Sequence, residues 1–283
     1  MKLSVIILNF NRPGFIKKDI IPSLNNNNNI DEIIISHGKK ETKFEGGGYK
    51  VKHLHHYGEM NKKYGLTLRF LSGLESKNKH MIIMDDDIIP TTGTINTLFE
   101  KIQKDERIYG LYGRDIRNGY TVTNCFGEVP IILTRCLVTT KGMCQYFIDN
   151  YNNYEYEEIK KAKPFWNGED ILFSLLSIKK YNKLPISIEL KHYNRYWNYL
   201  NIADSISVGG NHLSYRKMIS DKFVDDLDIK QVIRNNTKVN YTKNQFLYFL
   251  TNSILIYYIF IIIFFSSIFI FRKKIKSKLK WIT

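Results

Sequence analysis

Short apolar runs alternate with amphipathic stretches through the first 85 residues of the chain. The run LSVIIL at residues 3–8 predicts a buried strand, and Pro13, after the loop NFNRPG, marks the start of a helix. Further strands are expected at DEIIIS, at the end of EGGGYKVKHLHH and at KHMIIMD, with a helix over NKKYGLTLRFLSGLES. This order is typical of an α/β nucleotide-binding half with a mixed, mainly parallel sheet flanked by helices.

The pattern is less regular beyond residue 90. Helices are expected at TINTLFEKIQ, KGMCQYFIDNYNNY and NGEDILFSLLSIKKYN, and strands at IYGLYG, YTVTN, VPIILTRCLVT and LPISIEL. Glu169 and Asp170 fall in the first turn of the third of these helices, where acids also satisfy free amide groups and the helix dipole. We expect one domain over residues 1–230, followed by a linker over 231–245.

The longest apolar stretch lies near the C-terminus. Residues 246–271 contain no charged side chain, and a helix of this length reaches about 39 Å, enough to cross a hydrocarbon core of ~30 Å. The sequence therefore predicts a transmembrane or membrane-embedded helix over 246–271, followed by a basic tail over 272–283.

The orientation of this segment is open. The positive-inside tendency favours a cytoplasmic tail, whereas the N-terminus MKLSVIILNF reads as a strand and not as a signal peptide. One span cannot leave both ends in the cytoplasm, so the tail is translocated, the helix only partly enters the membrane, or the domain is exported. We expect a membrane-associated protein whose main domain faces the cytoplasm.

Charge and cysteine content exclude two classes of protein. The net charge is +15, but six basic residues lie in RKKIKSKLK at 272–280, and the remaining +9 forms no arginine-rich stripe among aromatics. We therefore expect no nucleic-acid partner. Cys125, Cys136 and Cys144 are odd in number and lack metal-ligand spacing, which predicts free thiols and no disulfide framework.

Three consecutive aspartates, Asp85, Asp86 and Asp87, directly follow the apolar strand KHMIIM. Neighbouring carboxylates repel each other, and a divalent cation removes that repulsion. Because side chains alternate along a strand, Asp85 and Asp87 are expected on one side and Asp86 on the other. Ligands of such sheets bind at the carboxyl ends of the strands, so we predict a Mn²⁺ or Mg²⁺ site that also holds phosphate. A solvated acidic turn is the alternative.

The motifs SVIILNFNRP, MIIMDDDI and NGEDILFSLL, in this order and spacing, resemble those of GT-A glycosyltransferases, which have a Rossmann-like fold. With YGLYGRD and the pattern GG-N-H--YR, they are most similar to the exostosin-type family of retaining N-acetylhexosaminyltransferases. The resemblance covers residues 3–225. The large inverting GT-A family, which has a similar ED helix, is a close competitor.

The resemblance implies a metal-dependent transfer of a sugar from a nucleotide-diphosphate donor, expected to be UDP-linked, to a glycan, lipid-linked or protein-linked acceptor. It also implies roles for the residues around the donor: Asn9 and Arg12 at the nucleobase, Arg69 at the diphosphate, Asp85 at the ribose and the metal, Asp86 beside the donor, and Asp87 on Mn²⁺.

Asp170 is the first candidate for the chemistry, with Glu169 as the alternative. Asp170 would deprotonate the acceptor hydroxyl in an inverting reaction, or flank the anomeric carbon in a retaining one. His212 and Arg216 are four residues apart, so both can lie on one helical face above the leaving diphosphate. Asp115 is expected at the acceptor.

Two other classes of function stay open at this point. A nucleotidyl- or phosphotransferase could use a related sheet, although EGGGYKVK leads into a strand and not into a helix. A non-catalytic membrane-anchored nucleotide-sugar binding module could retain the acids without turnover. His192 is a rival for a metal or phosphate role, whereas HLHH at 53–56 is expected to be a strand end.

Overall fold

The computed structural model describes residues 1–154, 167–189, 194–195 and 212–241. Residues 1–241 form one compact unit, and residues 242–283 form a second. The predicted membrane helix and basic tail, and also His192, lie outside the described residues. Within the described ranges, no helix combines the length and the apolar character needed to cross a bilayer.

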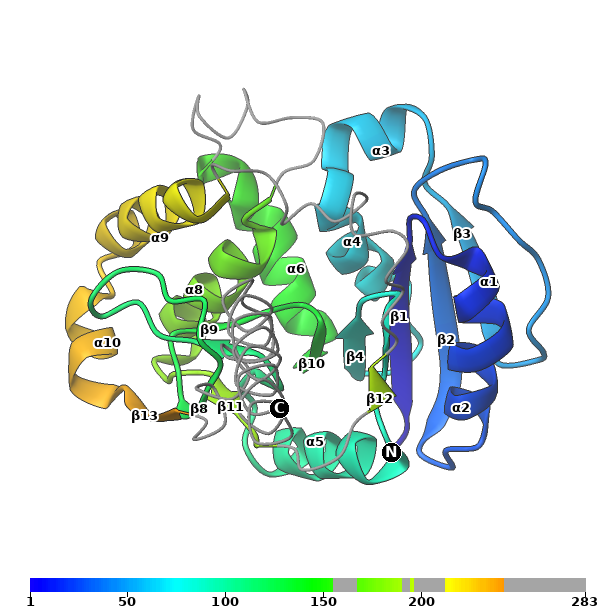
Figure 1. Cartoon of the computed structure of the whole chain (residues 1–283), viewed down its shortest axis with the longest axis horizontal. Coiled ribbons are helices and arrows are strands. Elements are labelled where there is room, and N and C mark those ends of the chain that lie inside the picture. The colour runs from blue at the N-terminus through cyan, green and yellow to red at the C-terminus, as the bar shows by residue number, and fades with distance from the viewer. Residues whose placement is uncertain (155–166, 190–193, 196–211, 242–283) are drawn as a thin grey trace, which may run out of the picture. The chain divides into compact units, whose positions relative to one another are not determined.

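The N-terminal part of the sheet is parallel, as its apolar runs predict. β1 (Leu3–Asn9) pairs in parallel with β2 (Ile30–His37) on one side and with β4 (His80–Met84) on the other, and β2 pairs with β3 (Val51–His55). The carboxyl ends of these strands therefore meet at one edge of the sheet (Figure 1).

Beyond β4 the sheet is largely antiparallel, so that the whole sheet is mixed. β10 (Cys136–Thr140) runs antiparallel to β4 and also to β6 (Tyr109–Gly110). The sheet continues with β11 (Ile186–Ser187), β8 (Cys125–Glu128), β7 (Gly113–Arg114) and β9 (Ile131–Ile132), and β13 (Lys238–Tyr241) pairs with β8; a separate pair joins β5 (Ile88–Ile89) and β12 (Asn194–Arg195).

Three strand predictions in this region differ from the structure. IYGLYG at 108–113 is divided between β6 and β7. Residues 120–124 form no strand, and β8 begins only at Cys125. The run at 129–139 is two strands, β9 and β10, because a turn interrupts it at Thr134 and Arg135. This turn brings both side chains to the sheet edge where β4 ends, since Asp85 N–H donates to the Arg135 carbonyl at 3.1 Å.

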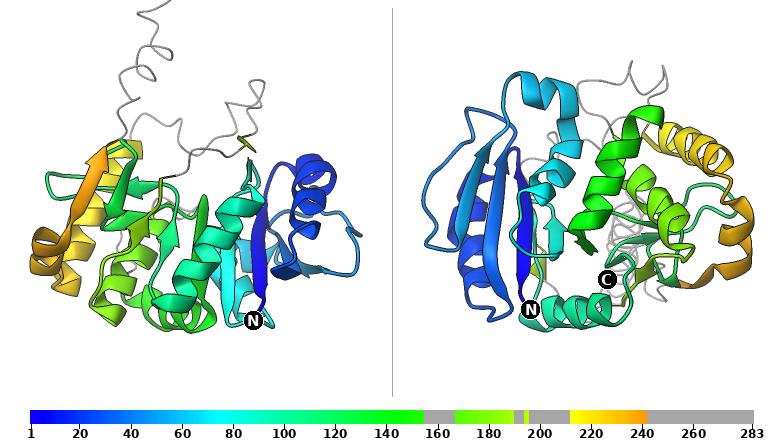
Figure 2. Two further views of the ribbon diagram at one scale, coloured as in Figure 1. Left: turned by 90° about the horizontal axis from the view of Figure 1, so that it is seen from below. Right: turned by 180° about the vertical axis from the view of Figure 1, so that it is seen from behind.

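Helices cover both faces of the sheet (Figure 2), because both sets of alternating strand residues are apolar. Ile6, Ile83 and Leu137 share one core cluster with α4, α6, α8 and α9, whereas Ile7 and Ile82 share the other with α2 and α5. The helices are α1 (Pro13–Phe15), α2 (Ile21–Asn25), α3 (Glu59–Tyr64), α4 (Leu68–Leu74), α5 (Thr92–Lys104), α6 (Lys141–Asn150), α8 (Glu169–Tyr181), α9 (His212–Leu227) and α10 (Lys230–Asn236), with shorter helical turns at Ile16–Ile20, Gly65–Thr67 and Tyr151–Tyr154.

The compact unit extends into the region where the sequence predicts a linker, residues 231–245. Most of α10 and all of β13 lie there, and β13 adds a strand to the antiparallel half of the sheet. Tyr241 at the end of β13 donates from its hydroxyl to Asp115 Oδ2 at 2.9 Å. This bond links the last described residue to the loop that follows β7.

Candidate functional site

A cavity of about 550 Å³ opens at the carboxyl ends of β1 and β4. It is the place where ligands are expected on a sheet of this type. Its lining combines loops after β1, β4 and β7 with the starts of α8 and α9: Leu8, Phe10, Asn11, Arg12, Leu66, Arg69, Asp85, Asp86, Asp87, Arg114, Tyr120, Val122, Leu133, Thr134, Arg135, Asn167, Glu169, Asp170, His212, Leu213 and Arg216.

Asp86 braces the loop after β1. Arg12 Nη1 donates to Asp86 Oδ1 at 2.5 Å, and the backbone N–H groups of Phe10 and Asn11 point at Oδ2 from 3.5 and 3.4 Å. Burial raises the pKa of Asp86, although the Arg12 guanidinium opposes the effect. Arg12 and Asp86 therefore both lie at the predicted edge of the sheet, but their charged groups bind each other.

Arg69 connects the end of β4 with the start of α8. Its buried guanidinium donates to Asp85 Oδ1 at 2.9 Å and to the Thr134 hydroxyl, and its Nη2 lies 3.8 Å from Glu169 Oε1. Asp87 lies beside a second arginine, with Arg135 Nη2 3.5 Å from its Oδ2. Two carboxylates at the cavity are therefore each held by an arginine from a neighbouring element.

The two acids at the start of α8 have different environments. Asp170 Oδ1 accepts from the backbone N–H of Ile171 at 2.8 Å, and both of its oxygens accept from Arg216 Nη2, at 2.9 and 2.7 Å. Glu169 is equally buried, but among the described residues its carboxylate accepts one hydrogen bond, from the Gly168 N–H at 3.2 Å, and lies 3.8 Å from Arg69 Nη2. Burial, reinforced by the negative charge of Asp170, raises the pKa of Glu169 to about 7.

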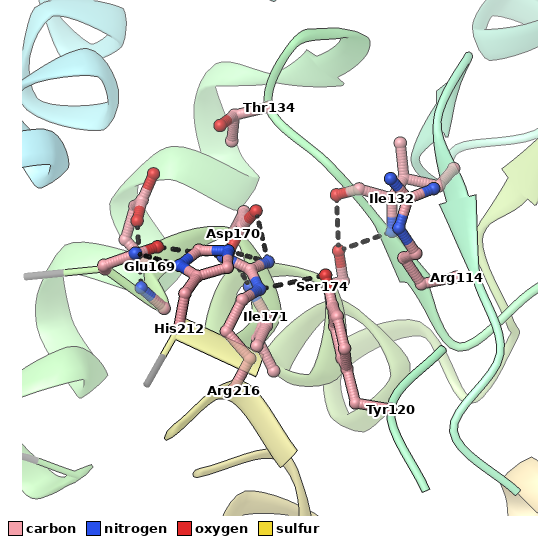
Figure 3. A network of polar contacts seen from close by, with 12 residues as sticks. Arg114, Tyr120, Ile132, Thr134, Glu169, Asp170, Ile171, Ser174, His212 and Arg216 are labelled. Atoms are coloured by element: carbon pink, nitrogen blue, oxygen red, sulfur yellow. Dashed lines mark hydrogen bonds and ion pairs between the residues drawn. The ribbon is translucent and has the colours of Figure 1, made fainter. Parts of the chain in front are cut away.

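Arg216 is held by three different groups (Figure 3). Besides Asp170, its Nε donates to the Tyr120 hydroxyl and its Nη1 to Asn167 Oδ1, each at 2.9 Å. Burial would lower the pKa of Arg216, but the charges of Asp170 and Glu169, the hydrogen bonds to Asp170 and the contact with Tyr120 together outweigh burial, and the pKa is raised. His212, one turn earlier on α9, lines the same cavity as Arg216.

Two of the predicted site residues lie outside this lining. Asn9 is buried, and its Nδ2 hydrogen-bonds to His37 Nδ1 at 2.9 Å and to the Thr42 carbonyl at 2.8 Å. It shares strand parity with Val5 and Ile7, which turns its side chain away from Leu8 and the cavity. Among the described residues, Asn9 is therefore not part of the lining of this cavity, and its contact with a nucleobase stays a prediction.

Asp115 is also placed elsewhere. Burial would raise its pKa, but hydrogen bonds from Arg117 and Tyr241 outweigh this and lower it. Arg117 Nη2 donates to Asp115 Oδ2 at 2.8 Å, so the carboxylate is bound by an arginine of its own loop. Because Asp115 already accepts hydrogen bonds from Arg117 and Tyr241, its carboxylate is less able to make the contact with an acceptor that the sequence predicts.

The histidines at 53–56 form a strand end, as expected, and the rings of His53 and His55 contact His37. His37 Nε2 lies 2.9 Å from His53 Nδ1, and the His37 and His55 rings stack at 5.3 Å. Within the described residues, no group of three or more histidine, cysteine or acidic side chains is arranged to hold a metal ion by itself.

Tyr120, Asn167, Arg114 and Arg135 line the cavity without having been predicted from the sequence. Tyr120 and Asn167 lie in irregular segments, where no periodicity shows which way a side chain points. The position of Asn167, directly before the GED motif, is the one signal that could have identified it.

Comparison with known proteins agrees with this geometry. Residues 3–247 match the glycosyl transferase family 64 domain, and the search of curated proteins finds no match. The solved structure of S. aureus TarS 1-349 in complex with UDP-GlcNAc is 16% identical, with a TM-score of 0.47, over 79% of this chain and 72% of that one. The structure of GalNAc-T7 with UDP, GalNAc and Mn²⁺ is 11% identical, with a TM-score of 0.55, over 80% of this chain and 50% of that one. The second likeness supports a GT-A-like fold.

Proposed function

Because the chain belongs to glycosyl transferase family 64 and is therefore a glycosyltransferase, we propose that it transfers an N-acetylhexosamine from a UDP-linked donor to a lipid-linked or protein-linked glycan. The solved GalNAc-T7 contains UDP, GalNAc and Mn²⁺, which supports the donor class. The similarity of DDDI, GED and GG-N-H--YR to the exostosin-type family supports the sugar.

The observation that carries this proposal is that one cavity brings together two chemically different groups from separate elements. Asp85 and Asp87 follow β4, where a diphosphate and its cation would bind, and Asp170 at the start of α8 is paired with Arg216 of α9. A transferase needs this arrangement, because the leaving group and the reacting carbon require separate stabilisation.

The carboxylates after β4 fit a divalent cation that completes its coordination with phosphate. Asp86 is committed to Arg12, whereas the side chains of Asp85 and Asp87 remain 29% and 24% exposed at the cavity. Mn²⁺ and Mg²⁺ commonly use one or two carboxylates together with substrate phosphates. We assign the cation to Asp87, with Asp85 as the second contact. When bound, it would offset the charge of the leaving diphosphate.

We assign Asp170 to stabilise positive charge at the anomeric carbon, and not to act as a free base. Both of its oxygens already accept hydrogen bonds from Arg216, so the ion pair holds the carboxylate in place. Glu169 has a pKa raised to about 7 and can exchange a proton near neutral pH. This division supports the retaining alternative.

The test is donor-dependent stabilisation of the purified full chain. We expect the melting temperature to rise only when Mn²⁺ and either UDP-GlcNAc or UDP-GalNAc are both present, and UDP-glucose and UDP-galactose serve as comparison donors. Asp87→Asn should melt at the same temperature without ligand but lose the shift. Absence of a shift with every UDP-sugar, for a folded protein, would contradict the donor assignment.

We further propose that residues 246–271 hold the enzyme at a membrane and that the catalytic domain faces the cytoplasm. The uncharged stretch and the basic residues at 272–280, which suit anionic headgroups, support this proposal. Membrane fractionation of the full chain and of a variant ending at Tyr241 tests it. Release of the shorter chain alone is expected, and equal distribution of both would contradict it.

A further inference from the structure

Asn167 hydrogen-bonds to two side chains of α9, and the chemistry of one partner fixes its orientation. Arg216 Nη1 donates to Asn167 Oδ1 at 2.9 Å, and Asn167 Nδ2 lies 2.9 Å from His212 Nδ1. A guanidinium carries only donors, so the oxygen of the amide has to face Arg216. The amide nitrogen of Asn167 therefore faces His212.

This orientation determines where the proton of His212 resides. The amide nitrogen only donates, so His212 Nδ1 has to accept and carries no proton in this arrangement. Burial lowers the pKa of His212, the positive charge of Arg216 lowers it further, and Asp170 opposes both effects. The ring is consequently neutral at pH 7, with its one proton on Nε2.

Among the residues that the structure describes, none occupies the Nε2 side of the His212 ring. His212 lines the cavity, and within the described part of the chain its ring has no hydrogen bond except that from Asn167. In Figure 3 His212 and Arg216 point together toward the start of α8. A neutral ring with a fixed Nε2–H is a hydrogen-bond donor that does not act as a base.

We propose that Asn167 is a positioning residue that holds His212 as the Nε2–H tautomer, so that the ring donates to an oxygen of the leaving diphosphate. This inference rests on the proposed function for the identity of the ligand, but not for the tautomer. Arg216 fixes the orientation of the Asn167 amide, and the amide in turn fixes the tautomer of His212, so the three side chains act as one unit.

The proposal has a consequence for pH dependence. Nε2 keeps its proton in both the neutral and the protonated ring, so donation by His212 persists as the pH rises. Among the described residues, the charged groups that act on the ring are Arg216 on the same helix and Asp170 on α8. Removing a donor aimed at developing negative charge commonly lowers the rate by 10²–10³.

Asn167→Asp reverses the hydrogen bond with almost no change of shape. A carboxylate only accepts, so Nδ1 of His212 has to carry the proton, and the neutral ring then has none on Nε2. The added negative charge also raises the pKa of His212. We expect kcat of Asn167→Asp, with UDP-GlcNAc or UDP-GalNAc and Mn²⁺, to fall at least tenfold as the pH rises through that pKa, whereas the unmodified enzyme shows no such fall.

Two measurements on the full chain decide the question. Nitrogen-15 NMR of labelled histidine shows which ring nitrogen is protonated, and we expect Nε2 in the unmodified enzyme and Nδ1 in Asn167→Asp at high pH. His212→Gln is the matched control, because its amide N–H replaces Nε2–H with a donor that does not titrate. The double variant Asn167→Asp/His212→Gln should therefore lose the alkaline fall.

A proton on Nδ1 in the unmodified enzyme would overturn the proposal. So would an Asn167→Asp variant whose proton moves to Nδ1 while its pH profile stays unchanged. If the enzyme transfers neither sugar, the proposed function fails by itself, and the NMR result still decides the role of Asn167.

Discussion

Arg216 Nη2 lies 2.9 Å from Asp170 Oδ1 and 2.7 Å from Asp170 Oδ2, so one nitrogen of the guanidinium donates to both oxygens of the carboxylate. The two side chains come from α9 and α8, and both are buried. A charge in such a position is stable only beside its partner. The pair therefore sets the position of the carboxylate and ties together two helices that line the cavity.

The first prediction concerns Arg216→Lys, which keeps the charge but loses the fork that also reaches Tyr120 and Asn167. We expect kcat to fall about 100-fold with little change in the donor KM, because the contact acts in the transition state. Steady-state kinetics measure both constants. A larger effect on KM than on kcat would mean that Arg216 serves ground-state binding instead.

A stability measurement on the same pair provides a control. Arg216→Met leaves Asp170 buried without its partner and should cost about 3–5 kcal/mol in unfolding free energy. Adding Asp170→Asn removes the orphaned charge, so the double variant should lose less than the sum of the single variants. Urea unfolding of the three variants tests this, and simple additivity would argue that the two residues are energetically independent.

The second prediction separates two neighbouring aspartates. Asp86→Asn breaks the pair with Arg12 and should lower the unfolding free energy by about 1–3 kcal/mol. Asp87→Asn should change it by less than about 0.5 kcal/mol but abolish the stabilisation by Mn²⁺ with a UDP-sugar. Thermal unfolding with and without ligands distinguishes them, and identical behaviour of the two variants would contradict the assigned roles.

These roles show what the sequence can predict. The apolar runs that end in polar residues identify the parallel strands, and parallel strands place their carboxyl ends at one edge. Arg12, Asp85 and Asp87 can therefore be brought together without a structure. Helical spacing does the same for His212 and Arg216, because four residues make about one turn.

Other features depend on packing that periodicity does not encode. Tyr120 and Asn167 hold Arg216 from irregular segments. The turn at Thr134, which interrupts an apolar run, contains neither glycine nor proline and gives no local signal. Asn9 is different, because alternation along β1 already places it with Val5 and away from Leu8, so its exclusion from the cavity follows from the sequence.

The third prediction is a pH dependence of stability caused by Glu169. Its pKa is raised from 4.5 to about 7 in the folded protein, chiefly by burial. Between these values the folded state binds a proton that the unfolded state has lost, so the unfolding free energy decreases as the pH rises. The loss from this group is at most about 3 kcal/mol.

Glu169→Gln should remove this dependence, since glutamine resembles the protonated acid at every pH. We expect the variant to match the unmodified chain near pH 4.5 and to exceed its stability above pH 7. Urea unfolding at several pH values gives both curves. Parallel curves for the two proteins would show that Glu169 titrates near its ordinary value.

The fourth prediction concerns the thiols. Burial raises the pKa values of Cys125, Cys136 and Cys144 to about 12, and all three side chains are buried. The thiolate is the reactive form, so at pH 8 we expect iodoacetamide to leave the folded chain unlabelled and to modify all three cysteines in guanidinium chloride. Mass spectrometry counts the labels. Cys144→Ser in α6 is a matched control, which should reduce the number of labels on the denatured chain by one. Rapid labelling of any cysteine in the folded protein would show that its thiol is accessible and ionised, which would contradict its burial in the core.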